Sequence, residues 1–322
     1  MPEKTNVKQR KKEPKKDDNV TSEEDESKLN KRNLKFGPLP SFRNQRTWTR
    51  IVLFIGLFTV LHFYKGSNNE KPLAKQNEFF HKRGNTVECS ESYSKEANKF
   101  KTCTPFKCGR FVTDSLITLT EAGLLNELAK KGLAAGGSNG GASVVDFHSG
   151  VLSVGDKFVN LYRTGVVKVT KHDMDFLQMI ESKLKHAVAE TFQIESDALY
   201  LTYPTLFSEL TNKEPATIHD EYWHPHIDMV TYDSFFYTTL LYLTDFDQDF
   251  KGGRFVFMDK KANYTVEPRK GRVLMFTSGS ENEHFVEKVT EGKRYALTVA
   301  FTCDPSKKIK NREIKGPVNV GK

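Results

Sequence analysis

The chain has 322 residues, 28% of them charged and 37% hydrophobic, and a formal net charge of +8 at pH 7. One catalytic domain of about 200 residues with extensions fits this length, because single cores seldom grow past about 250 to 300 residues. The basic residues concentrate in the first fifty positions and the last sixteen. The net positive charge therefore comes mainly from the two ends of the chain and does not indicate a binding surface for nucleic acid. We expect no nucleic-acid partner.

Residues 1–47 are rich in Lys, Glu, Asp and Asn and nearly free of large apolar side chains. Such a segment cannot bury enough apolar surface to offset the entropy lost on ordering, so we predict a disordered tail. The basic run at residues 8–12 resembles a nuclear-localisation signal, but acidic residues interrupt the tail and an apolar segment follows it. A second, basic tail is predicted at residues 306–322.

The segment 48–65 contains the most apolar run of the chain, uncharged over residues 51–64. Although short for a membrane span, it has aromatic residues at both ends and Arg50, which can reach the interface. We predict a transmembrane signal-anchor helix; a buried core helix is the alternative, and no cleavage site supports a signal peptide. Every charged residue over 31–50 is basic, which places the amino terminus in the cytoplasm. The catalytic domain would then face the lumen of the endoplasmic reticulum or a later secretory compartment.

All four cysteines lie beyond this segment, an even number that is typical of disulfides in an oxidising compartment. Their spacing does not match a zinc site. We predict that the last cysteine pairs with one of the other three; free buried thiols are the alternative. The sequon at Asn263 is predicted to carry a glycan, which requires the luminal orientation. The cysteines are Cys89, Cys103, Cys108 and Cys303.

Residues 66–110 are polar and weakly periodic, which predicts a luminal stalk, and residues 111–197 are predicted to form a helical support region. Within that region Thr120 is the expected N-cap of a helix that ends at Gly132. A second helix is predicted over residues 171–192, because apolar residues recur there at four-residue intervals. Its predicted buried face comprises Phe176, Ile180, Leu184 and Val188.

A Gly-rich segment at residues 136–141 follows no predicted strand and lacks the GxxxxGK pattern, so a flexible loop explains it better than a phosphate site. Over residues 198–305 the pattern changes to short β-branched and aromatic runs between turn residues. This predicts a jelly-roll that could hold a small ligand in its mouth. The run over 235–243 has almost no polar alternation and should be buried on both faces. The predicted strands cover residues 198–203, 235–243, 254–258, 272–276, 284–289 and 294–302.

Three candidate metal ligands lie in this half of the chain: His226, Asp228 and His284. In an extended segment residues i and i+2 project from one face, so His226 and Asp228 are expected on the same side. His284 comes from a distant segment, which requires a curled β-scaffold. Two histidines and a carboxylate on one side of a metal leave the opposite positions open, as in non-haem Fe(II) oxygenases. A zinc hydrolase built on the same ligands is an alternative.

Neighbouring polar residues compete for this site. His224 precedes the first ligand by two residues on the same extended face, and His219 lies close by. A site built on His224 would leave His284 unused, so we expect both rivals to be supporting or surface residues. The loop acids Asp220 and Glu221 are expected to be solvated.

Arg294 follows His284 by ten residues and begins a run of apolar side chains. A guanidinium binds a carboxylate through two parallel charge-assisted hydrogen bonds. A surface salt bridge is the alternative, but the apolar flank favours burial. We therefore predict that Arg294 holds the distal carboxylate of a dicarboxylate co-substrate, a task that a zinc hydrolase would not require.

The order HxD, YL, GG, a distal His and then Arg within RYALT resembles the 2-oxoglutarate and Fe(II)-dependent dioxygenases of the prolyl/lysyl hydroxylase type, over residues 198–304. A membrane-anchored, single-span branch of that family is more similar still, with near counterparts of DEYWH, YTTLLYL, VEPRKGRV, FTSGSENEH and RYALTVAF. The resemblance implies an α+β fold with a double-stranded β-helix core, flanking helices and one transmembrane helix. It also implies Fe(II), the co-substrates 2-oxoglutarate and O2, and L-ascorbate. The ten-residue interval before Arg294 is slightly longer than is usual in prolyl hydroxylases.

By the same resemblance, the hydroxyl groups of Tyr203, Tyr242 and Thr298 line the co-substrate pocket, with core packing as the alternative for each. The chain is predicted to be a membrane-anchored dioxygenase that hydroxylates a prolyl or lysyl residue of a secretory-pathway protein and releases succinate and CO2. Its residues do not separate prolyl from lysyl, or protein from small-molecule, substrates. The rival is a membrane-tethered binding module that keeps the fold without turnover, against which the intact ligand set argues.

Overall fold

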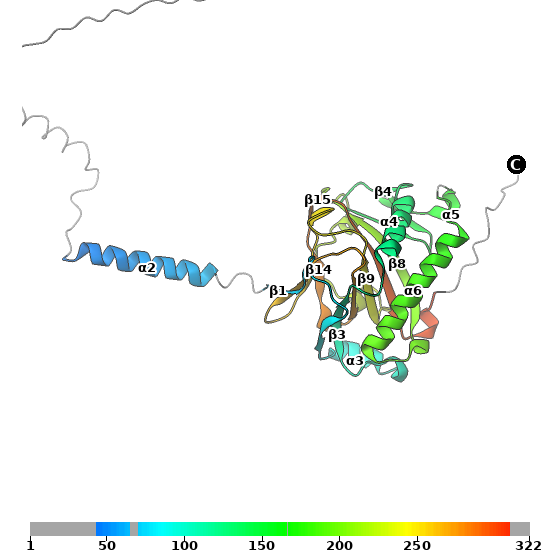
Figure 1. Ribbon diagram of the computed structural model, residues 1–322, viewed down its shortest axis with the longest axis horizontal. Helices are drawn as coiled ribbons and strands as arrows, with labels where there is room; N and C mark the ends of the chain where they lie inside the picture. Colours follow the sequence, from blue (N-terminus) through cyan, green and yellow to red (C-terminus); the bar gives the residue numbers. More distant parts are fainter. Residues whose placement is uncertain (1–42, 65–69, 166, 310–322) are drawn as a thin grey trace, which may run out of the picture. The chain divides into compact units, whose positions relative to one another are not determined.

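The residues that the computed structural model describes are 43–64, 70–165 and 167–309 (Figure 1). The chain forms two compact units, Met1–Ser67 and Asn68–Lys322. The predicted tails, 1–47 and 306–322, lie largely outside the described residues.

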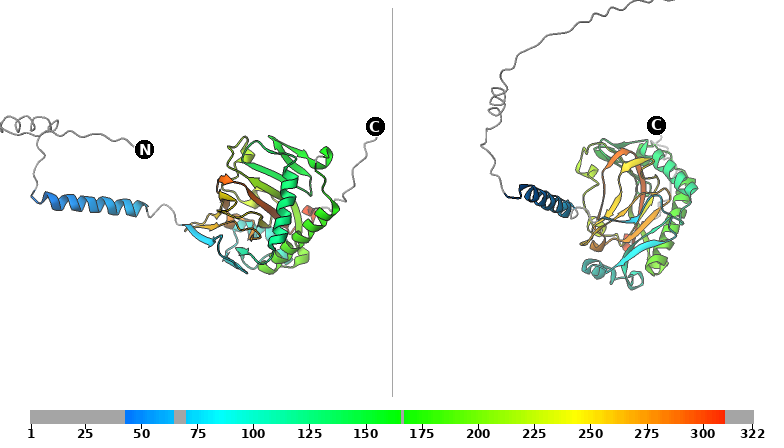
Figure 2. Two further views of the ribbon diagram at one scale, coloured as in Figure 1. Left: turned by 45° about the horizontal axis from the view of Figure 1, so that its top comes forward. Right: turned by 60° about the vertical axis from the view of Figure 1, so that its left-hand side comes forward.

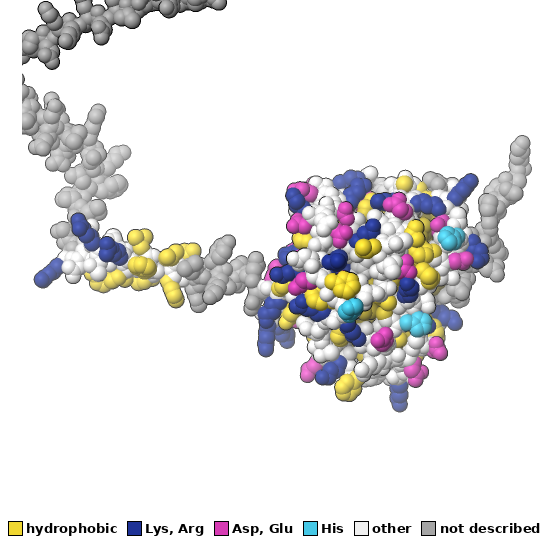
Figure 3. Space-filling model, viewed as in Figure 1, with side chains coloured by type: hydrophobic (Ala, Val, Ile, Leu, Met, Phe, Trp, Pro, Cys, Tyr) yellow, Lys and Arg dark blue, Asp and Glu magenta, His cyan; other side chains and the backbone are white. Residues whose placement is uncertain are grey.

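Helix α2 (Gln45–Tyr64) forms from the apolar segment of the first unit. Its large apolar side chains from Trp48 to Val60 are exposed, and Figure 3 shows them along the helix. Among the described residues, no helix is both long and apolar enough to cross a membrane.

Ten strands of the described residues form one large sheet in the order β2-β3-β13-β9-β16-β8-β5-β6-β4, with β7 paired to β6. In the antiparallel centre of this sheet, Thr238 lies opposite Phe276 on one side and Ala300 on the other. Because side chains alternate along a strand, Thr238, Leu240 and Tyr242 share one face of β9. The strands are β2 (Arg83–Val87), β3 (Cys108–Thr113), β4 (Gly137–Ser138), β5 (Ala142–Asp146), β6 (Val151–Gly155), β7 (Lys157–Asn160), β8 (Tyr200–Leu210), β9 (Tyr237–Tyr242), β13 (Val273–Thr277) and β16 (Arg294–Thr302).

A four-stranded sheet of the order β1-β12-β11-β14 packs against this face of the large sheet. The contact is apolar, since Leu240, Leu274 and Phe276 of the large sheet cluster with Phe255 and Phe257 of β11. The described domain therefore has a mixed α/β fold with a core rich in β-sheet. The strands are β1 (Glu70–Ala74), β11 (Phe255–Phe257), β12 (Asn263–Val266) and β14 (His284–Val286), and a separate pair is formed by β10 (Phe250–Gly252) and β15 (Val289–Gly292).

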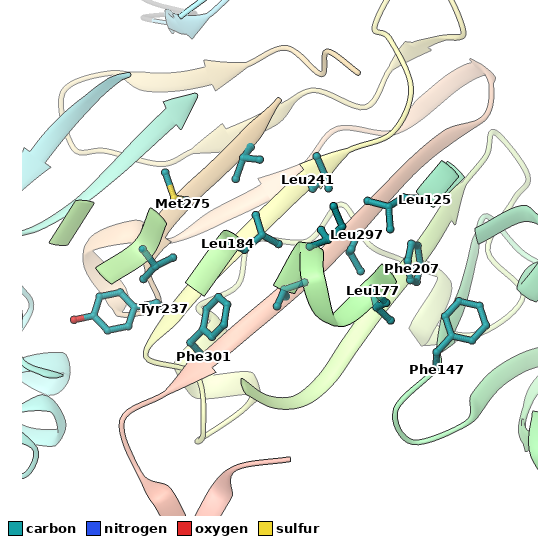
Figure 4. Close-up of a cluster of buried hydrophobic side chains, with 14 of the residues drawn as sticks. Leu125, Phe147, Leu177, Leu184, Phe207, Tyr237, Leu241, Met275, Leu297 and Phe301 are labelled. Atoms are coloured by element: carbon teal, nitrogen blue, oxygen red, sulfur yellow. The ribbon is translucent and has the colours of Figure 1, made fainter. Parts of the chain in front are cut away.

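Helices α4 (Leu119–Leu133) and α6 (Lys171–Phe192) cover the opposite face of the large sheet (Figure 2). Each fully buried leucine between them contributes about 1.5–3 kcal/mol. Because helices cover one face of β9 and the small sheet covers the other, all six residues of β9 are buried, as its lack of polar alternation predicted. The buried leucines include Leu125, Leu177, Leu184, Leu241 and Leu297 (Figure 4).

Short helices connect these layers. They are α3 (Glu91–Ala97), α5 (Leu161–Thr164), α7 (Asp228–Thr231) and the single 3-10 turns Lys101–Cys103, Ser196–Ala198, Ile218–Asp220, Ser280–Asn282 and Pro305–Lys307.

Both predicted helices form, but α4 begins and ends differently from the prediction. Its N-cap is Thr118 rather than Thr120, because a reciprocal capping box joins Thr118 to Glu121. Gly132, predicted to end the helix, is buried inside it. A Cβ atom there would lie 2.7 Å from the ring of Phe147, so close packing rather than helix termination requires the glycine. Helix α6 has the predicted bounds.

The predicted stalk at residues 66–110 is wrong from residue 70 onward, where the chain is part of the folded domain. Strand β1 pairs with β12, and β2 and β3 form an edge of the large sheet. Strand β2 reads RGNTV and is only half-buried, so its composition does not reveal it. Disulfides join Cys89 to Cys108 and Cys103 to Cys303, which confirms the predicted pairing of Cys303.

Candidate metal centre

His226, Asp228 and His284 converge, and one ligand atom from each lies within 4.8 Å of the others. His226 and His284 are directly opposite in an antiparallel bridge, with reciprocal N–H···O distances of 2.9 and 3.0 Å. Asp228 begins helix α7, and its Oδ1 lies 3.6 Å from Nε2 of each histidine. Two imidazole nitrogens and a carboxylate oxygen therefore surround one point, a donor set that suits Fe(II).

A backbone carbonyl holds the other ring nitrogen of each histidine. Nδ1 of His226 lies 3.0 Å from the carbonyl oxygen of His224, and Nδ1 of His284 lies 2.8 Å from that of Asn282. A carbonyl oxygen only accepts hydrogen bonds, so Nδ1 carries the proton in both rings. Nε2 consequently keeps its lone pair for a metal.

The metal centre is buried on one side and open on the other. His284 is 3% exposed and stacks on Phe255 with ring centroids 4.6 Å apart. Burial lowers the pKa of His284 to about 4, so the imidazole is neutral, as ligation requires. Asp228 Oδ2 accepts a hydrogen bond of 2.6 Å from Thr238 Oγ1, which fixes the carboxylate. The side chain of His226 is 38% exposed and marks the open side.

A cavity of about 500 Å³ lies between the two sheets and includes the metal centre in its wall. This volume is in the range of small-ligand sites. Leu240 and Phe276 line it from the centre of the large sheet, Phe255 from the small sheet, and Thr298 and Arg294 from β16. The apolar walls shield His284 from solvent, whereas His226 faces the open side.

Arg294 is a buried cation in the wall of this cavity, 2% exposed. Its Nε and Nη2 have no hydrogen-bond partner among the described residues, and neither does the hydroxyl group of Tyr242. The guanidinium carbon lies 5.3 Å from the Tyr242 ring centroid. Burial lowers the pKa of Arg294 and raises the pKa of Tyr242 to about 12, so Tyr242 stays a neutral donor. Because unpaired buried donors cost free energy, this corner fits the carboxylate of a ligand.

Of the three other residues predicted to line the co-substrate pocket, two lie at the cavity and one does not. Thr298 lines the cavity and Tyr242 lies beside Arg294, whereas Tyr203 is 39% exposed and does not line the cavity. Asn263 begins strand β12 and is half-buried. The residues of β8 that line the cavity are Pro204, Leu206, Ser208 and Leu210.

Of the two rival histidines, His224 does not join the ligand set. Nε2 of His224 is hydrogen-bonded to Glu221 at 2.7 Å, and its carbonyl supports His226. The side chain of His219 lies outside what the structure describes. His224 is therefore a supporting residue, as predicted.

Asp220 is buried rather than solvated, contrary to the prediction. Its carboxylate accepts hydrogen bonds from Ser138 Oγ at 2.6 Å and from the Thr217 backbone at 2.8 Å. Gly140 passes so close that a Cβ atom would lie 2.3 Å from the Asp220 carboxylate. The Gly-rich segment 136–141 is therefore bound to the loop before the metal ligands, and Ser138 lines the cavity.

Two residues of the site were not predicted. Thr238 orients Asp228, and its place two residues before Leu240 on a strand was the available signal. Tyr222 lines the cavity, donates a hydrogen bond to the Thr211 carbonyl at 3.2 Å and accepts one from the Val289 N–H at 3.0 Å. These partners are distant in the chain, so no local pattern indicated them.

Comparison with known proteins decides the class of this site. Residues 216–302 match the family model described as 2OG-Fe(II) oxygenase superfamily. The 2-oxoglutarate and iron-dependent oxygenase domain-containing protein 3 of Mus musculus is 51% identical over 271 residues, which cover 81% of this chain and 86% of that protein. The chain belongs to the 2OG-Fe(II) oxygenase superfamily. The resemblance seen in the sequence is thereby confirmed.

This oxygenase is a dioxygenase of the hydroxylase kind, and its family implies Fe(II), 2-oxoglutarate and O2. Prolyl 3-hydroxylase 2 of Homo sapiens is 44% identical over 72 residues, 21% of this chain and 10% of that protein. A crystal structure of a 2OG-Fe(II) oxygenase family oxidoreductase from Burkholderia pseudomallei is 14% identical with a TM-score of 0.43, covering 70% of this chain and 98% of that chain. The His-Asp-His donor set and the unpaired N–H groups of Arg294 fit iron and a dicarboxylate.

Proposed function

We propose that this oxygenase hydroxylates a prolyl or lysyl residue of a secretory-pathway protein, with release of succinate and CO2. One observation carries the proposal. The cavity is lined by the triad of His226, Asp228 and His284 and by Arg294, whose Nε and Nη2 have no hydrogen-bond partner among the described residues. A dicarboxylate can reach the metal with one end and Arg294 with the other only in such an arrangement.

In this proposal His226, Asp228 and His284 hold Fe(II), and Arg294 and Tyr242 bind the distal carboxylate of 2-oxoglutarate. Fe(II) and 2-oxoglutarate supply the oxidation, in which O2 converts the co-substrate to succinate and CO2 and hydroxylates a C–H bond. The residues orient these groups and exclude water. Thr298 completes the co-substrate wall, whereas the position of Tyr203 outside the cavity speaks against a role in it.

The mouth of the cavity supports a protein substrate. Ile218 and Val230 flank the metal loop and are 78% and 79% exposed, and Phe158 and Tyr232 line the mouth while 55% and 39% exposed. A small-molecule pocket buries about 70–90% of its ligand, which an open apolar rim beside the exposed ring of His226 does not do. A protein that brings its own surface to the rim would cover these side chains and close the metal centre.

We also propose a double-stranded β-helix core and a luminal orientation. The two facing sheets around the cavity support the first, and the two disulfides of the domain support an oxidising compartment. In the same proposal the segment 48–65 is a signal anchor, Asn263 carries a glycan, and L-ascorbate keeps the iron reduced. Protease treatment of intact microsomes should spare residues 70–309, and glycosidase should lower the apparent mass unless Asn263→Gln is introduced. Digestion of the domain in intact microsomes would reverse the topology.

Succinate release by the full chain with Fe(II), O2 and 2-oxoglutarate tests the proposed chemistry without knowledge of the substrate. We expect release to be lost in His226→Ala and kept in His186→Ala, a matched change of an exposed histidine on α6. Binding of Fe(II) and 2-oxoglutarate without any succinate would favour the rival, a binding module that keeps the fold. Binding of Zn(II) together with no succinate release on addition of Fe(II) would favour a hydrolase.

A further inference from the structure

The turn between β13 and β14 leads into His284, the first residue of β14, and is closed by Asn282, which is 1% exposed. Nδ2 of Asn282 donates to the carbonyl oxygen of Thr277 at 2.9 Å and to its hydroxyl oxygen at 2.9 Å. The backbone carbonyl of Asn282 accepts the Nδ1–H of His284 at 2.8 Å. One buried side chain therefore closes the turn whose backbone sets the tautomer and ring orientation of a metal ligand.

The same amide also reaches strand β3, where it donates to the carbonyl oxygen of Gly109 at 3.3 Å. Gly109 follows Cys108, which is disulfide-bonded to Cys89. Ser90, the residue after Cys89, donates its backbone N–H to the carboxylate of Glu281 in the turn at 3.2 Å. The residue after each of these two cysteines is therefore hydrogen-bonded to the His284 turn.

We propose that Asn282 is a positioning residue for His284, and that the Cys89–Cys108 disulfide holds the strand to which Asn282 is anchored. The inference rests on the metal centre of the proposed function and adds the means by which one ligand is oriented. Outer partners of metal ligands contribute about 10- to 100-fold in metal affinity. Loss of the amide donors opens the turn and lets the imidazole leave its place.

The second disulfide provides an internal control. Cys103 and Cys303 are 200 residues apart in sequence, against 19 for Cys89 and Cys108. The carbonyl of Cys103 accepts a hydrogen bond from Tyr237 rather than from the His284 turn. Because a longer loop loses more entropy on closure, removal of the Cys103–Cys303 bond should cost more stability. It should nevertheless leave the metal centre intact. Loss of the Cys103–Cys303 bond should therefore have the larger effect on stability, and loss of the Cys89–Cys108 bond the larger effect on metal affinity.

The first arm of the test compares two buried asparagines in the full chain, with Co(II) as the probe. Asn282→Asp replaces the donating amide by an acceptor, and we expect Co(II) to bind about 10- to 100-fold more weakly, with an altered visible d–d spectrum. Asn126→Asp on α4 is the matched control, 8% exposed, and should change neither. If circular dichroism shows that Asn282→Asp does not fold, Thr277→Val removes one acceptor of the amide and should show a smaller loss in the same direction.

The second arm compares the double variants Cys89→Ser/Cys108→Ser and Cys103→Ser/Cys303→Ser. We expect weaker Co(II) binding in the first alone, although the second unfolds at lower denaturant concentration. Unchanged affinity and spectrum in both Asn282→Asp and Thr277→Val, or equal losses in the two disulfide variants, would overturn the inference. Failure of the proposed function looks different, because the unmodified chain would then bind no Co(II) that His226→Ala removes.

Discussion

Two buried arginines, Arg272 and Arg294, differ in whether the fold supplies acceptors for their N–H groups. Arg272 precedes β13 and is 0% exposed, and its Nε and Nη2 bond both carboxylate oxygens of Asp114 at 2.8 and 3.1 Å. Its three remaining donors are accepted by the backbone carbonyls of Glu267, Glu78 and Lys75, at 2.8, 2.7 and 3.0 Å. Arg294, at the start of β16, leaves Nε and Nη2 unpartnered among the described residues.

The difference separates a structural charge from a functional one. A buried guanidinium with a full set of acceptors stabilises the fold. Removing its carboxylate partner leaves a buried, uncompensated charge and lowers the free energy of unfolding. A buried guanidinium without acceptors costs free energy until a ligand supplies them. Arg272 should therefore carry stability, and Arg294 should carry co-substrate affinity.

The largest effect is expected at the structural charge. Asp114→Ala leaves Arg272 buried without its carboxylate and should lower the free energy of unfolding by about 3–5 kcal/mol. Arg294→Met, measured without 2-oxoglutarate, should leave it unchanged or raise it, because an unpaired charge is removed. Urea unfolding followed by circular dichroism compares the two. Equal losses in both variants would remove the distinction between the arginines.

His284 extends the comparison to the metal side of the cavity. Burial lowers the pKa of His284 to about 4, below its ordinary 6.5, so the unfolded chain takes up this proton first as the pH falls. The free energy of unfolding of the metal-free protein should therefore not depend on His284 above pH 6.5. It should fall by about 3 kcal/mol as the pH is lowered to 4 and below. Unfolding midpoints across this range, for the unmodified chain and His284→Gln, measure it. A pH profile that His284→Gln does not flatten would contradict the burial argument.

When 2-oxoglutarate binds, Arg294 should contribute to the stability of the protein, because the ligand supplies the acceptors that its N–H groups lack. With metal present, 2-oxoglutarate at a hundredfold excess over its Kd should raise the free energy of unfolding by about 2.7 kcal/mol. Arg294→Met should show far less of this gain at the same concentration, since it lacks the donors. Thermal unfolding with and without 2-oxoglutarate checks this. A full gain in Arg294→Met would place the carboxylate elsewhere.

The smallest effect concerns the hydroxyl group beside Arg294. Tyr242→Phe removes one neutral donor and should weaken 2-oxoglutarate binding by about 0.5–1.5 kcal/mol without loss of stability. The matched control is Tyr237→Phe on the other face of β9, whose hydroxyl bonds the Cys103 carbonyl. It should lower stability and leave binding alone. Calorimetric titration of both variants decides whether Tyr242 belongs to the pocket.

Local patterns in the sequence indicated the parts of the fold that depend on one segment. Helix α6 has the predicted bounds because apolar residues recur along it at four-residue intervals. Strand β16 has them because a run of β-branched and aromatic residues follows the turn at residues 291–292. The ligands His226, Asp228 and His284 were identified because residue type and spacing carry the chemistry. In the structure, one potential ligand atom of each residue lies within 4.8 Å of the others, close enough to bind the same metal ion.

What the sequence did not indicate depends on partners that are distant in the chain. Strands β1 and β2 are short and mostly polar, so they are recognisable only from the strands beside them. Asp220 was expected in solvent because its partner Ser138 is 82 residues away. The capping residue Thr118 was missed for a different reason, because two threonines stand two residues apart and only Glu121 decides between them.

Anaerobic titration of the Fe(II)-loaded chain with 2-oxoglutarate tests the central claim most directly, through the visible charge-transfer band that chelation produces. We expect the unmodified chain to form the band and Arg294→Ala to need about 30-fold more 2-oxoglutarate, the loss that a buried charge pair implies. Arg294→Lys should fall between them, and Arg110→Lys, a control at an arginine that is 1% exposed, should match the unmodified chain. Equal affinity in Arg294→Ala and the unmodified chain would contradict the assignment of Arg294, and no band in the unmodified chain would contradict the site as a whole.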